Sequence, residues 1–264
     1  AGSPLKACVL LNVDPMLDLA DGPAALATLR GAEMVVSLTP FMPQPGDDAA
    51  DVLLPIAPFT ETSGTFVNAG GRAQSFHGVV RPLGDARPAW KVLRVLGNLL
   101  GLNGFAFETS EAVCEEALGD VATLGARLAA ASAPALGELS LPPTSGASGL
   151  ERIADVPIYA TDPIVRRAPA LQLTADARPP TVGVPSELAA ARGIVEGTMV
   201  RVSSGNGDSS TSVTLAAHVD PSLAANVLRV PAGHPLTAPL GAAATGLVLA
   251  VVPMAAGATA PTVA

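Results

Sequence analysis

Residues 7–38 read ACVLLNVDPMLDLADGPAALATLRGAEMVVSL, and this stretch predicts the fold of the first part of the chain. Its first five residues form an unbroken apolar run, which is typical of a strand covered on both faces. Asp21 is placed to cap a helix that Gly31 ends. Residues 34–38 then form a second buried strand. Because strand, helix and strand follow one another within about 30 residues, we expect a βαβ unit with two parallel strands.

The next segments continue this α/β pattern. Residues 51–55 predict a third short strand, which its proline ends. Residues 56–87 form a loop-rich stretch dense in Gly, Thr, Ser and Asn. A helix is expected from Pro88 to Gly101, and a second from Ser110 toward Ala130. The residues expected on the buried face of the first of these helices are Trp90, Leu93, Leu96, Gly97 and Leu100.

The second half has a different character. Residues 131–148 are rich in Ala, Pro, Gly and Ser and predict a linker, and residues 151–167 are expected to be extended. Ser186 is placed to cap a short helix. Residues 204–207 (SGNG) are typical of a hairpin turn. The apolar, mostly alternating runs expected to form strands are residues 197–202, 212–215, 227–231 and 246–252. Several short strands with regular turns predict a small β-barrel.

The sequence therefore predicts an α/β portion over residues 1–130, a linker and bridging segment over 131–165, and a β-barrel over 166–264. The chain begins at Ala1 and enters a strand almost at once, so we expect a piece of a longer protein. Aromatic residues make up only 3% of the chain, so the core should consist of Ala, Val and Leu.

Charge and cysteine content narrow the possible partners. The 264 residues carry a formal charge of −8, and the 15 basic residues are scattered, which argues against nucleic acid or anionic lipid as partners. The apolar run 246–256 is interrupted by Pro253 and is too short to insert into a membrane. Cys8 and Cys114 are expected to be buried free thiols. Two cysteines cannot by themselves hold an iron–sulfur cluster or a structural zinc ion.

No catalytic or metal-binding motif is visible. His77, His218 and His234 are far apart and lie in no nucleophile or zinc motif. Residues 70–72 (GGR) and 205–207 (GNG) lack the rest of a phosphate-binding loop and are better explained as tight turns. We therefore predict no catalytic residue and no metal ligand in this chain.

The loop that follows residue 55 remains as a candidate site, because it lies beyond the carboxyl end of a predicted parallel strand. Glycines in such a loop let the backbone approach a ligand closely. Its residues suit either a polar ligand or hydrogen bonds that order the loop against a neighbouring domain. Its polar residues are Thr60, Glu61, Thr62, Ser63, Thr65, Asn68 and Arg72.

Residues 50–68 (ADVLLPIAPFTETSGTFVN) and 71–74 (GRAQ) resemble the loop signature of the molybdopterin oxidoreductase family. Residues 84–93 (GDARPAWKVL) are similar to the segment that follows it in that family. In the second half, residues 193–205 resemble the strand entry of the family's C-terminal barrel. Residues 230–235 (VPAGHP) and 164–167 (IVRR) resemble the large iron–sulfur subunit of bacterial NADH–quinone oxidoreductase (respiratory complex I).

The resemblance implies a Rossmann-like, mostly parallel sheet followed by a barrel of the double-psi type. It also implies that the iron–sulfur ligands lie in an N-terminal part missing from this chain, and that the large complex I subunit keeps the fold without the molybdenum cofactor. We therefore expect no cofactor in this chain. Glu61, Asn68 and Arg72 match the loop signature and are the candidate residues of a relict pterin face; the alternative is that they order the loop. Gly71 departs from family members that carry an acidic residue before the arginine.

The function expected from the resemblance is that of a structural, non-catalytic part of this large iron–sulfur subunit. Its partners would be other subunits of the peripheral arm, on the cytoplasmic side of the inner membrane. One alternative is the C-terminal half of a formate dehydrogenase-like molybdoenzyme that binds molybdopterin guanine dinucleotide. Another is a stand-alone protein–protein adaptor derived from the same fold.

Overall fold

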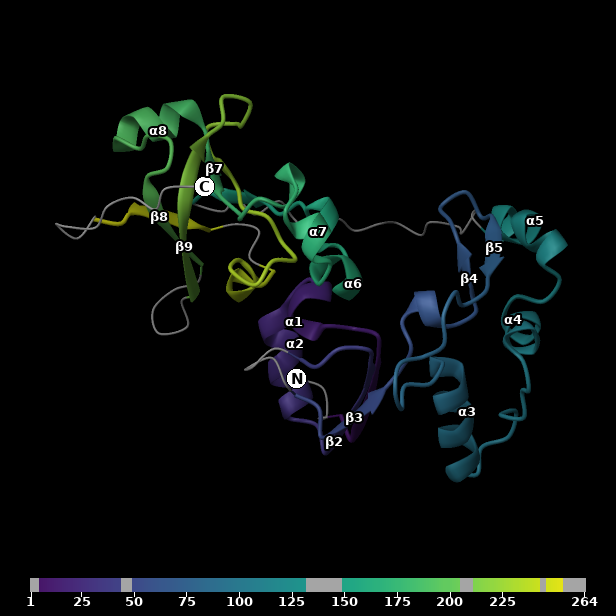
Figure 1. Ribbon diagram of the computed structural model, residues 1–264. Helices are drawn as coiled ribbons and strands as arrows, with labels where there is room; N and C mark the ends of the chain where they lie inside the picture. The colour runs from purple at the N-terminus through teal and green to yellow at the C-terminus, as the bar shows by residue number, and fades with distance from the viewer. Residues whose placement is uncertain (1–4, 44–48, 132–148, 205–210, 243–245, 254–264) are drawn as a thin grey trace.

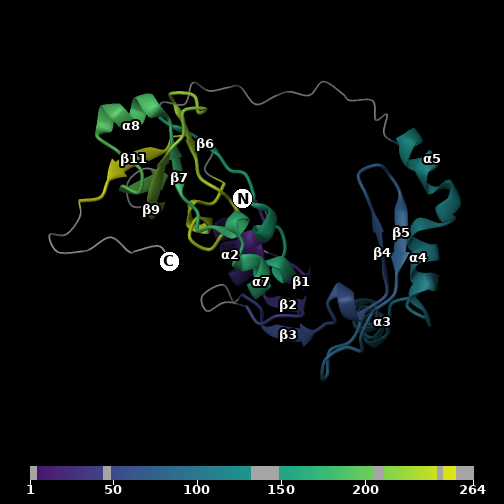
Figure 2. The same cartoon turned by 45° about the horizontal axis from the view of Figure 1, so that its top comes forward.

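The computed structural model describes residues 5–43, 49–131, 149–204, 211–242 and 246–253. The chain forms a small parallel sheet, an outer lobe and a curled sheet (Figure 1). The outer lobe, defined here as residues 56–131, and the curled sheet lie on opposite sides of the parallel sheet in both views (Figures 1 and 2).

The parallel sheet has the strand order β1–β2–β3. Strands β1 (Ala7–Leu11) and β2 (Met34–Thr39) pair in parallel, and β2 pairs in parallel with β3 (Val52–Pro55). Two helices, α1 (Pro15–Asp18) and α2 (Gly22–Arg30), connect β1 to β2. The predicted βαβ unit is therefore confirmed.

Local signals set the ends of α2. The carboxylate of Asp21 accepts a hydrogen bond from the backbone N–H of Ala24 at 3.1 Å, and Gly31 is the C-cap. Both agree with the sequence. The burial of β1 does not, because Val9 and Leu11 are exposed to 50% and 44%. In the described part of the chain β1 is an edge strand with one open face, whereas Val35 and Leu38 of β2 are buried.

The outer lobe begins with a short 3₁₀ turn, η1 (Phe59–Glu61), and the antiparallel hairpin of β4 (Gly64–Val67) and β5 (Ala73–Phe76). The rings of Phe59, Phe66 and Phe76 form an aromatic cluster, and the last two stack with centroids 5.0 Å apart. A Cβ at Gly64 would lie 2.7 Å from the Phe76 ring, so this close approach requires glycine.

Three helices complete the outer lobe: α3 (Ala89–Leu99), α4 (Ser110–Leu118) and α5 (Val121–Ala131). The prediction of α3 is confirmed. Of its expected buried face, Gly97 is buried and Trp90, Leu93 and Leu96 are half-buried, whereas Leu100 is exposed to 65%. The single helix expected over residues 110–130 is wrong. Gly119 has a positive φ of 61°, a conformation that favours glycine, and it ends α4 and separates it from α5.

The second half forms one six-stranded sheet in the order β11–β8–β9–β7–β10–β6. Its strands are β6 (Glu151–Ile153), β7 (Val182–Val184), β8 (Met199–Ser204), β9 (Thr211–Val219), β10 (Val227–Arg229) and β11 (Val248–Val251). The sheet curls until its two edges meet at one bridge, where Leu150 and Leu247 exchange backbone hydrogen bonds of 3.2 and 3.0 Å. We call this unit the curled sheet. Its strands confirm the β character expected of this half.

A continuous apolar core fills the curled sheet. Val182, Val200, Val202, Leu228 and Val230 all have zero exposure, and no aromatic ring lies among the fully buried side chains of the described residues. The expectation of a core made from Ala, Val and Leu is therefore confirmed.

Short helices and turns join these strands. They are η2 (Ile158–Ala160), α6 (Pro163–Arg166), α7 (Pro169–Gln172), η3 (Ala175–Ala177), α8 (Ser186–Arg192) and η5 (Ala238–Leu240). The extended structure expected over 151–167 is therefore wrong beyond β6, because Asp162 and Pro163 start α6. At α8 the N-cap is Pro185, so Ser186 is the first helical residue and its side chain makes no capping bond.

The observed architecture is thus a mixed α/β arrangement with a curled half-barrel sheet. The Rossmann-like and double-psi details, and the domain boundaries, stay predictions. Residues 132–148 of the expected linker and 205–207 of the expected turn lie outside the described residues. Cys8 and Cys114 are free and half-buried rather than buried. Within the described ranges, no helix has the length and apolar character needed to cross a bilayer.

Candidate functional site

Glu61, the first predicted site residue, braces a loop of the outer lobe. It ends η1, and its carboxylate accepts a hydrogen bond from the backbone N–H of Leu83 at 3.0 Å. The backbone of Gly78 passes so close that a Cβ there would lie 2.9 Å from the Glu61 carbonyl carbon. Glu61 therefore holds residues 78–83 against the start of the hairpin.

Asn68 and Arg72 form the turn of the β4–β5 hairpin. The amide oxygen of Asn68 accepts a hydrogen bond from the Arg72 N–H at 2.9 Å, and the Asn68 N–H donates to the Arg72 carbonyl at 3.1 Å. Gly71 has φ of 75°, a backbone conformation that favours glycine. Strand β4 separates Glu61 from Asn68 by about 13 Å of extended chain.

The structure therefore brings Asn68 and Arg72 together but leaves Glu61 at the other end of the hairpin. Each of these hydrogen bonds orders a loop, as the structural alternative requires. The Arg72 side chain is exposed. The role of these three residues as a pterin face stays a prediction.

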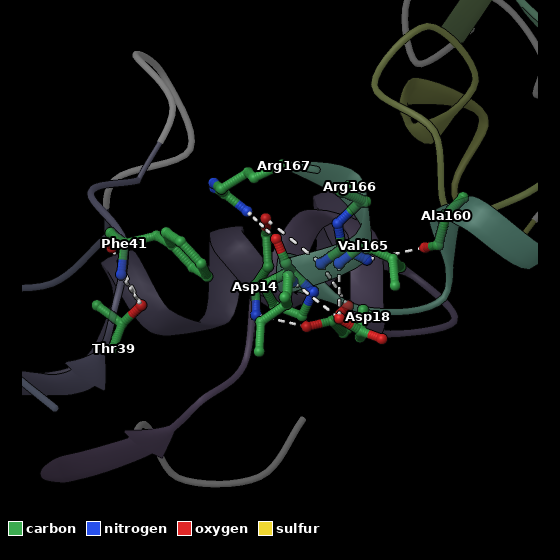
Figure 3. A network of polar contacts seen from close by, with 11 residues as sticks. Asp14, Asp18, Thr39, Phe41, Ala160, Val165, Arg166 and Arg167 are labelled. Carbon is green, nitrogen blue, oxygen red and sulfur yellow. Dashed lines mark hydrogen bonds and ion pairs between the residues drawn. The ribbon is translucent and has the colours of Figure 1, made fainter. Parts of the chain in front are cut away.

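A second group of polar side chains lies at the carboxyl ends of the parallel strands (Figure 3). Asp14 follows β1, and Asp18 ends α1. Arg166 of α6 reaches both carboxylates, with its Nη2 2.7 Å from Asp18 Oδ1 and 3.7 Å from Asp14 Oδ2. Its Nη1 also donates to the Ala160 carbonyl at 2.9 Å. This network joins the parallel sheet to the chain that enters the curled sheet.

The local sequence around α6 explains the position of Arg166. The Asp162 carboxylate caps α6 by accepting hydrogen bonds from the N–H groups of Ile164 and Val165 at 2.8 and 3.0 Å. Pro163 is compatible with the first turn because it lacks an N–H that would need a partner there. The short helix therefore starts at a fixed residue, and Arg166 and the following arginine face the strand ends.

Arg167 covers the end of β2. Its guanidinium lies 4.7 Å from the centre of the Phe41 ring, a cation–π contact, and its Nη1 donates to the Pro163 carbonyl at 3.2 Å. Thr39 fixes the turn below it by donating to the Phe41 carbonyl at 3.0 Å. A cavity of only about 40 Å³ remains here. It is lined in part by Leu10 and Arg167 and has room for about one or two water molecules.

A larger pocket of about 600 Å³ adjoins Arg166 and Arg167. The curled-sheet half contributes His234 and the exposed Arg178 to its wall, and Asp14 lies on the opposite side. Arg166 Nε is buried and has no hydrogen-bond partner within the described part of the chain. An unsatisfied buried N–H of this kind is costly unless a ligand or water accepts from it.

His234 is held in a fixed orientation. Its Nδ1 accepts a hydrogen bond from the Leu236 N–H at 3.1 Å, and its carbonyl accepts from the Thr237 hydroxyl at 3.2 Å. Burial lowers the pKa of His234 below its ordinary value, so the imidazole is neutral at pH 7. The arginines, rather than this histidine, supply the positive charge of the pocket.

Arg152 holds the His234 loop in place. Its guanidinium donates to the carbonyls of Val230, Gly241 and Pro231 at 2.9, 3.0 and 3.1 Å. Burial lowers the pKa of Arg152 as well. Because it joins both ends of the loop, Arg152 positions His234 without itself lining the pocket.

The sequence analysis did not identify the pocket beside Arg166 as a site. The adjacent arginines and the Asp-Pro helix start were visible, but Asp18 and Arg166 are 148 residues apart in sequence. In the described residues, no three His, Cys, Asp or Glu side chains gather as a metal ion would require.

Comparison with known proteins now places the chain. Residues 1–99 match the molybdopterin oxidoreductase family, and residues 159–262 match the molybdopterin dinucleotide binding domain. Each of these matches covers less than half of the 264 residues. The two matches cover both sides of the pocket beside Arg166, since Asp14 falls in the first match and Arg166 in the second.

Curated proteins that match part of this chain carry oxidoreductase names. A protein of Staphylococcus aureus (strain USA300) named "Putative formate dehydrogenase" is 43% identical over 54 residues, which are 20% of this chain and 6% of that protein. The "Probable oxidoreductase YjgC" of Bacillus subtilis (strain 168) is 40% identical over 68 residues, 26% of this chain and 7% of that protein. The matched segments therefore span only a small part of these relatives.

A solved structure supports the fold over most of the chain. The acetylene hydratase from Pelobacter acetylenicus superposes with a TM-score of 0.58 at 18% identity, over 90% of this chain and 39% of that protein. The likeness concerns the fold alone. The relatives named as formate dehydrogenase or oxidoreductase do not single out the NADH–quinone oxidoreductase component that the sequence was expected to match.

Proposed function

We propose that this chain forms part of a formate dehydrogenase-like molybdoenzyme and helps to bind the dinucleotide end of its molybdopterin cofactor. The observation that carries the proposal is the pocket of about 600 Å³ beside Arg166, which residues of both matched regions line. The whole protein's reaction, an oxidation of formate or of a related small substrate, follows from the names of the relatives and is part of the proposal.

The donor set of the pocket fits a nucleotide diphosphate. Phosphate oxygens accept charge-assisted hydrogen bonds, and Arg166, Arg167 and Arg178 all line the pocket. Arg178 is exposed and is therefore open to a ligand in this pocket. The position also agrees with the general preference of ligands for the carboxyl ends of parallel strands.

The carboxylates of the pocket fit the base of a guanine nucleotide. Asp14 and Asp176 line the same pocket as the arginines, and a carboxylate accepts hydrogen bonds from the N–H groups at the edge of guanine. When bound, the molybdenum centre of the cofactor would supply the two-electron chemistry. The residues of this chain bind and orient the distant end of the group and keep it in place.

The scaffold role in NADH–quinone oxidoreductase is the second candidate, and one observation favours it. Arg166 already pairs with Asp14 and Asp18, and Arg167 covers Phe41, so the strand ends keep a cavity of only about 40 Å³. In that role the chain would need no cofactor, and it would contact other subunits of a peripheral arm on the cytoplasmic side of the inner membrane.

Cofactor content separates the two candidates. We would purify the native full-length protein that carries this sequence, measure molybdenum by mass spectrometry, and measure oxidised pterin by fluorescence. The molybdoenzyme proposal expects about one metal and one or two dinucleotides per polypeptide. Absence of both, together with migration in an NADH dehydrogenase-active band on a native gel, would contradict it and support the scaffold.

The pocket itself is tested with GDP as the probe, titrated into the chain by calorimetry. Arg178→Gln should weaken GDP binding by about tenfold, because a charge-assisted hydrogen bond contributes about 1.5 kcal/mol or more. Arg201→Gln, on the exposed face of β8, is the matched control and should bind GDP like the parent. Equal affinity of the parent and Arg178→Gln would remove this pocket from the proposal.

A further inference from the structure

The outer lobe contains a groove that lies away from the pocket beside Arg166. It has a volume of about 1110 Å³ and runs between α4 on one side and the β4–β5 hairpin on the other. Figure 2 shows α4 beside this hairpin, on the side of the molecule away from the curled sheet. The groove shares no residue with the pocket beside Arg166.

The floor of the groove is apolar. The side chains of Phe76, Trp90, Val113 and Leu118 are only partly covered by other residues of the chain. Cys114 also lies in this floor, with its Sγ 3.4 Å from the Thr65 hydroxyl. The binding of a partner that covers half-buried apolar side chains in one groove is stabilised by the burial of their apolar surface.

The wall formed by α4 and the residues after it is acidic. Glu111, Glu115 and Asp120 line the groove, and all three are exposed. Hydrogen bonds from its own backbone N–H and from the Ser110 hydroxyl lower the pKa of Glu111, so its carboxylate is charged at pH 7. His77 faces these carboxylates from the hairpin side.

No lysine or arginine belongs to the described lining of the groove. Two cations lie nearby and are engaged in other contacts. Lys91 Nζ lies 5.3 Å from the centre of the Trp90 ring, and Arg127 donates to the carbonyls of Leu118 and Asp120. The described lining of the groove itself therefore carries three carboxylates and no lysine or arginine.

We propose that this groove binds a basic amphipathic helix of a partner protein. An amphipathic helix places its apolar face in such a groove, and its flanking lysines or arginines would then meet the carboxylates of Glu111, Glu115 and Asp120. The acidic wall repels acidic helices, so the groove would distinguish basic helices from acidic ones. The groove lies outside the proposed cofactor pocket, so the two proposals stand independently.

The test uses a synthetic helical peptide of leucine and lysine, about four turns long, with a leucine–glutamate peptide of the same pattern as its counterpart. Binding is measured by fluorescence anisotropy. Its location is measured by the rate at which N-ethylmaleimide alkylates Cys114, followed by mass spectrometry. Cys8, the only other cysteine, lies on β1 and is the internal control.

At a peptide concentration ten times the Kd, alkylation of Cys114 should slow by about tenfold, because about a tenth of the grooves stay free. The rate at Cys8 should not change. Replacing both Glu111 and Glu115 by Gln should weaken peptide binding by about 2- to 30-fold. The matched control replaces Glu33 and Glu187, two exposed acids outside the groove, by Gln and should leave the Kd unchanged.

Three results would overturn the proposal. The first is protection of Cys114 by the leucine–glutamate peptide as strong as that by the lysine peptide. The second is equal Kd values for the parent and the Glu111→Gln/Glu115→Gln variant. The third is protection that rises with protein concentration in the absence of peptide, which would assign the groove to a second copy of this chain. Loss of GDP binding would leave all three measurements unaffected.

Discussion

The curled sheet and the outer lobe differ in how each is held together. The curled sheet encloses a continuous apolar core in which Leu228, Val200 and Val182 are wholly buried. The outer lobe has no such cluster among its described residues, and its long helix α3 buries only Gly97 while Leu99 is exposed to 81%. The hydrophobic effect stabilises the first unit from within, whereas the second rests on local turns, caps and the aromatic cluster.

The two regions are therefore suited to different roles: the curled sheet to stability, and the outer lobe to binding another molecule. A core closed on itself leaves little apolar surface for a partner, so the curled sheet is suited to hold a pocket in a fixed shape. Apolar side chains left partly exposed on short elements are suited to contact another molecule. The groove of α4 and the hairpin belongs to this second kind of structure.

The largest expected effect is in the core of the curled sheet. Leu228→Ala should lower the free energy of unfolding by about 2–5 kcal/mol, because it opens a cavity in a closed core. Leu99→Ala in the outer lobe should change it by less than about 0.5 kcal/mol. Urea denaturation followed by circular dichroism measures both. Similar losses in the two variants would break the comparison.

The Arg166 network should come next. Arg166→Met removes the cation that Asp14 and Asp18 share, and we expect a loss of about 2–3 kcal/mol, since these side chains are mostly buried. Asp155→Asn breaks the exposed pair with Arg229 and should cost less than about 1 kcal/mol. If the parallel sheet and the curled sheet unfold in one cooperative transition, Arg166→Met should shift the same urea transition that Leu228→Ala shifts. A loss confined to a separate transition would show that the network does not join them.

Two glycines of the outer lobe should respond with opposite signs. A Cβ at Gly97 would lie 2.3 Å from the Phe105 ring, so Gly97→Ala should destabilise the lobe by about 1–2 kcal/mol. Gly125 lies in α5 with nothing within 4 Å of such a Cβ, so Gly125→Ala should stabilise it by about 0.5–1 kcal/mol. Thermal denaturation by circular dichroism gives both signs. Destabilisation in both variants would mean that α5 is packed more tightly than described.

The smallest effect concerns pH and the His234 loop. Because burial lowers the pKa of His234 in the folded state, the unfolded state binds more protons as the pH falls below the ordinary histidine value of about 6.5. Stability should therefore be full above this pH and decrease as the pH falls through the lowered pKa. His234→Asn should flatten this part of the Tm profile. An unchanged slope would assign the pH dependence to other groups.

The sequence correctly predicted the features that residues close together in the chain determine, namely the positions of strands and the ends of a helix. The apolar runs located β1, β2 and β3, and Asp21 and Gly31 marked the ends of α2 as they do in the structure. Gly119 was the instructive failure, because one glycine inside an alanine-rich helical pattern gave too weak a signal to predict a break. The exposure of β1 was missed because an apolar run indicates a strand but not what covers it.

Among the candidate sites, too, residues close together in the sequence were predicted and contacts between distant residues were not. Glu61, Asn68 and Arg72 were found because they lie in one continuous signature, and their hydrogen bonds order the loop locally. The Arg166 network was missed because it joins α1 to α6 across more than half of the chain, and a local pattern carries no information on such a contact. The groove required the structure as well, since its floor comes from three separate elements.

The bridge between Leu150 and Leu247 has a consequence for solubility. A six-stranded sheet that remained open would offer two rows of unpaired N–H and C=O groups, onto which other chains could add strands. Closure needs the backbones of Gly149 and Gly246 to pass within a distance that a side chain would block, with a Cβ at Gly149 lying 3.0 Å from Gly246 Cα. Leu247→Pro, which removes the N–H that donates to Leu150, should therefore expose both edges and promote fibrillar aggregation.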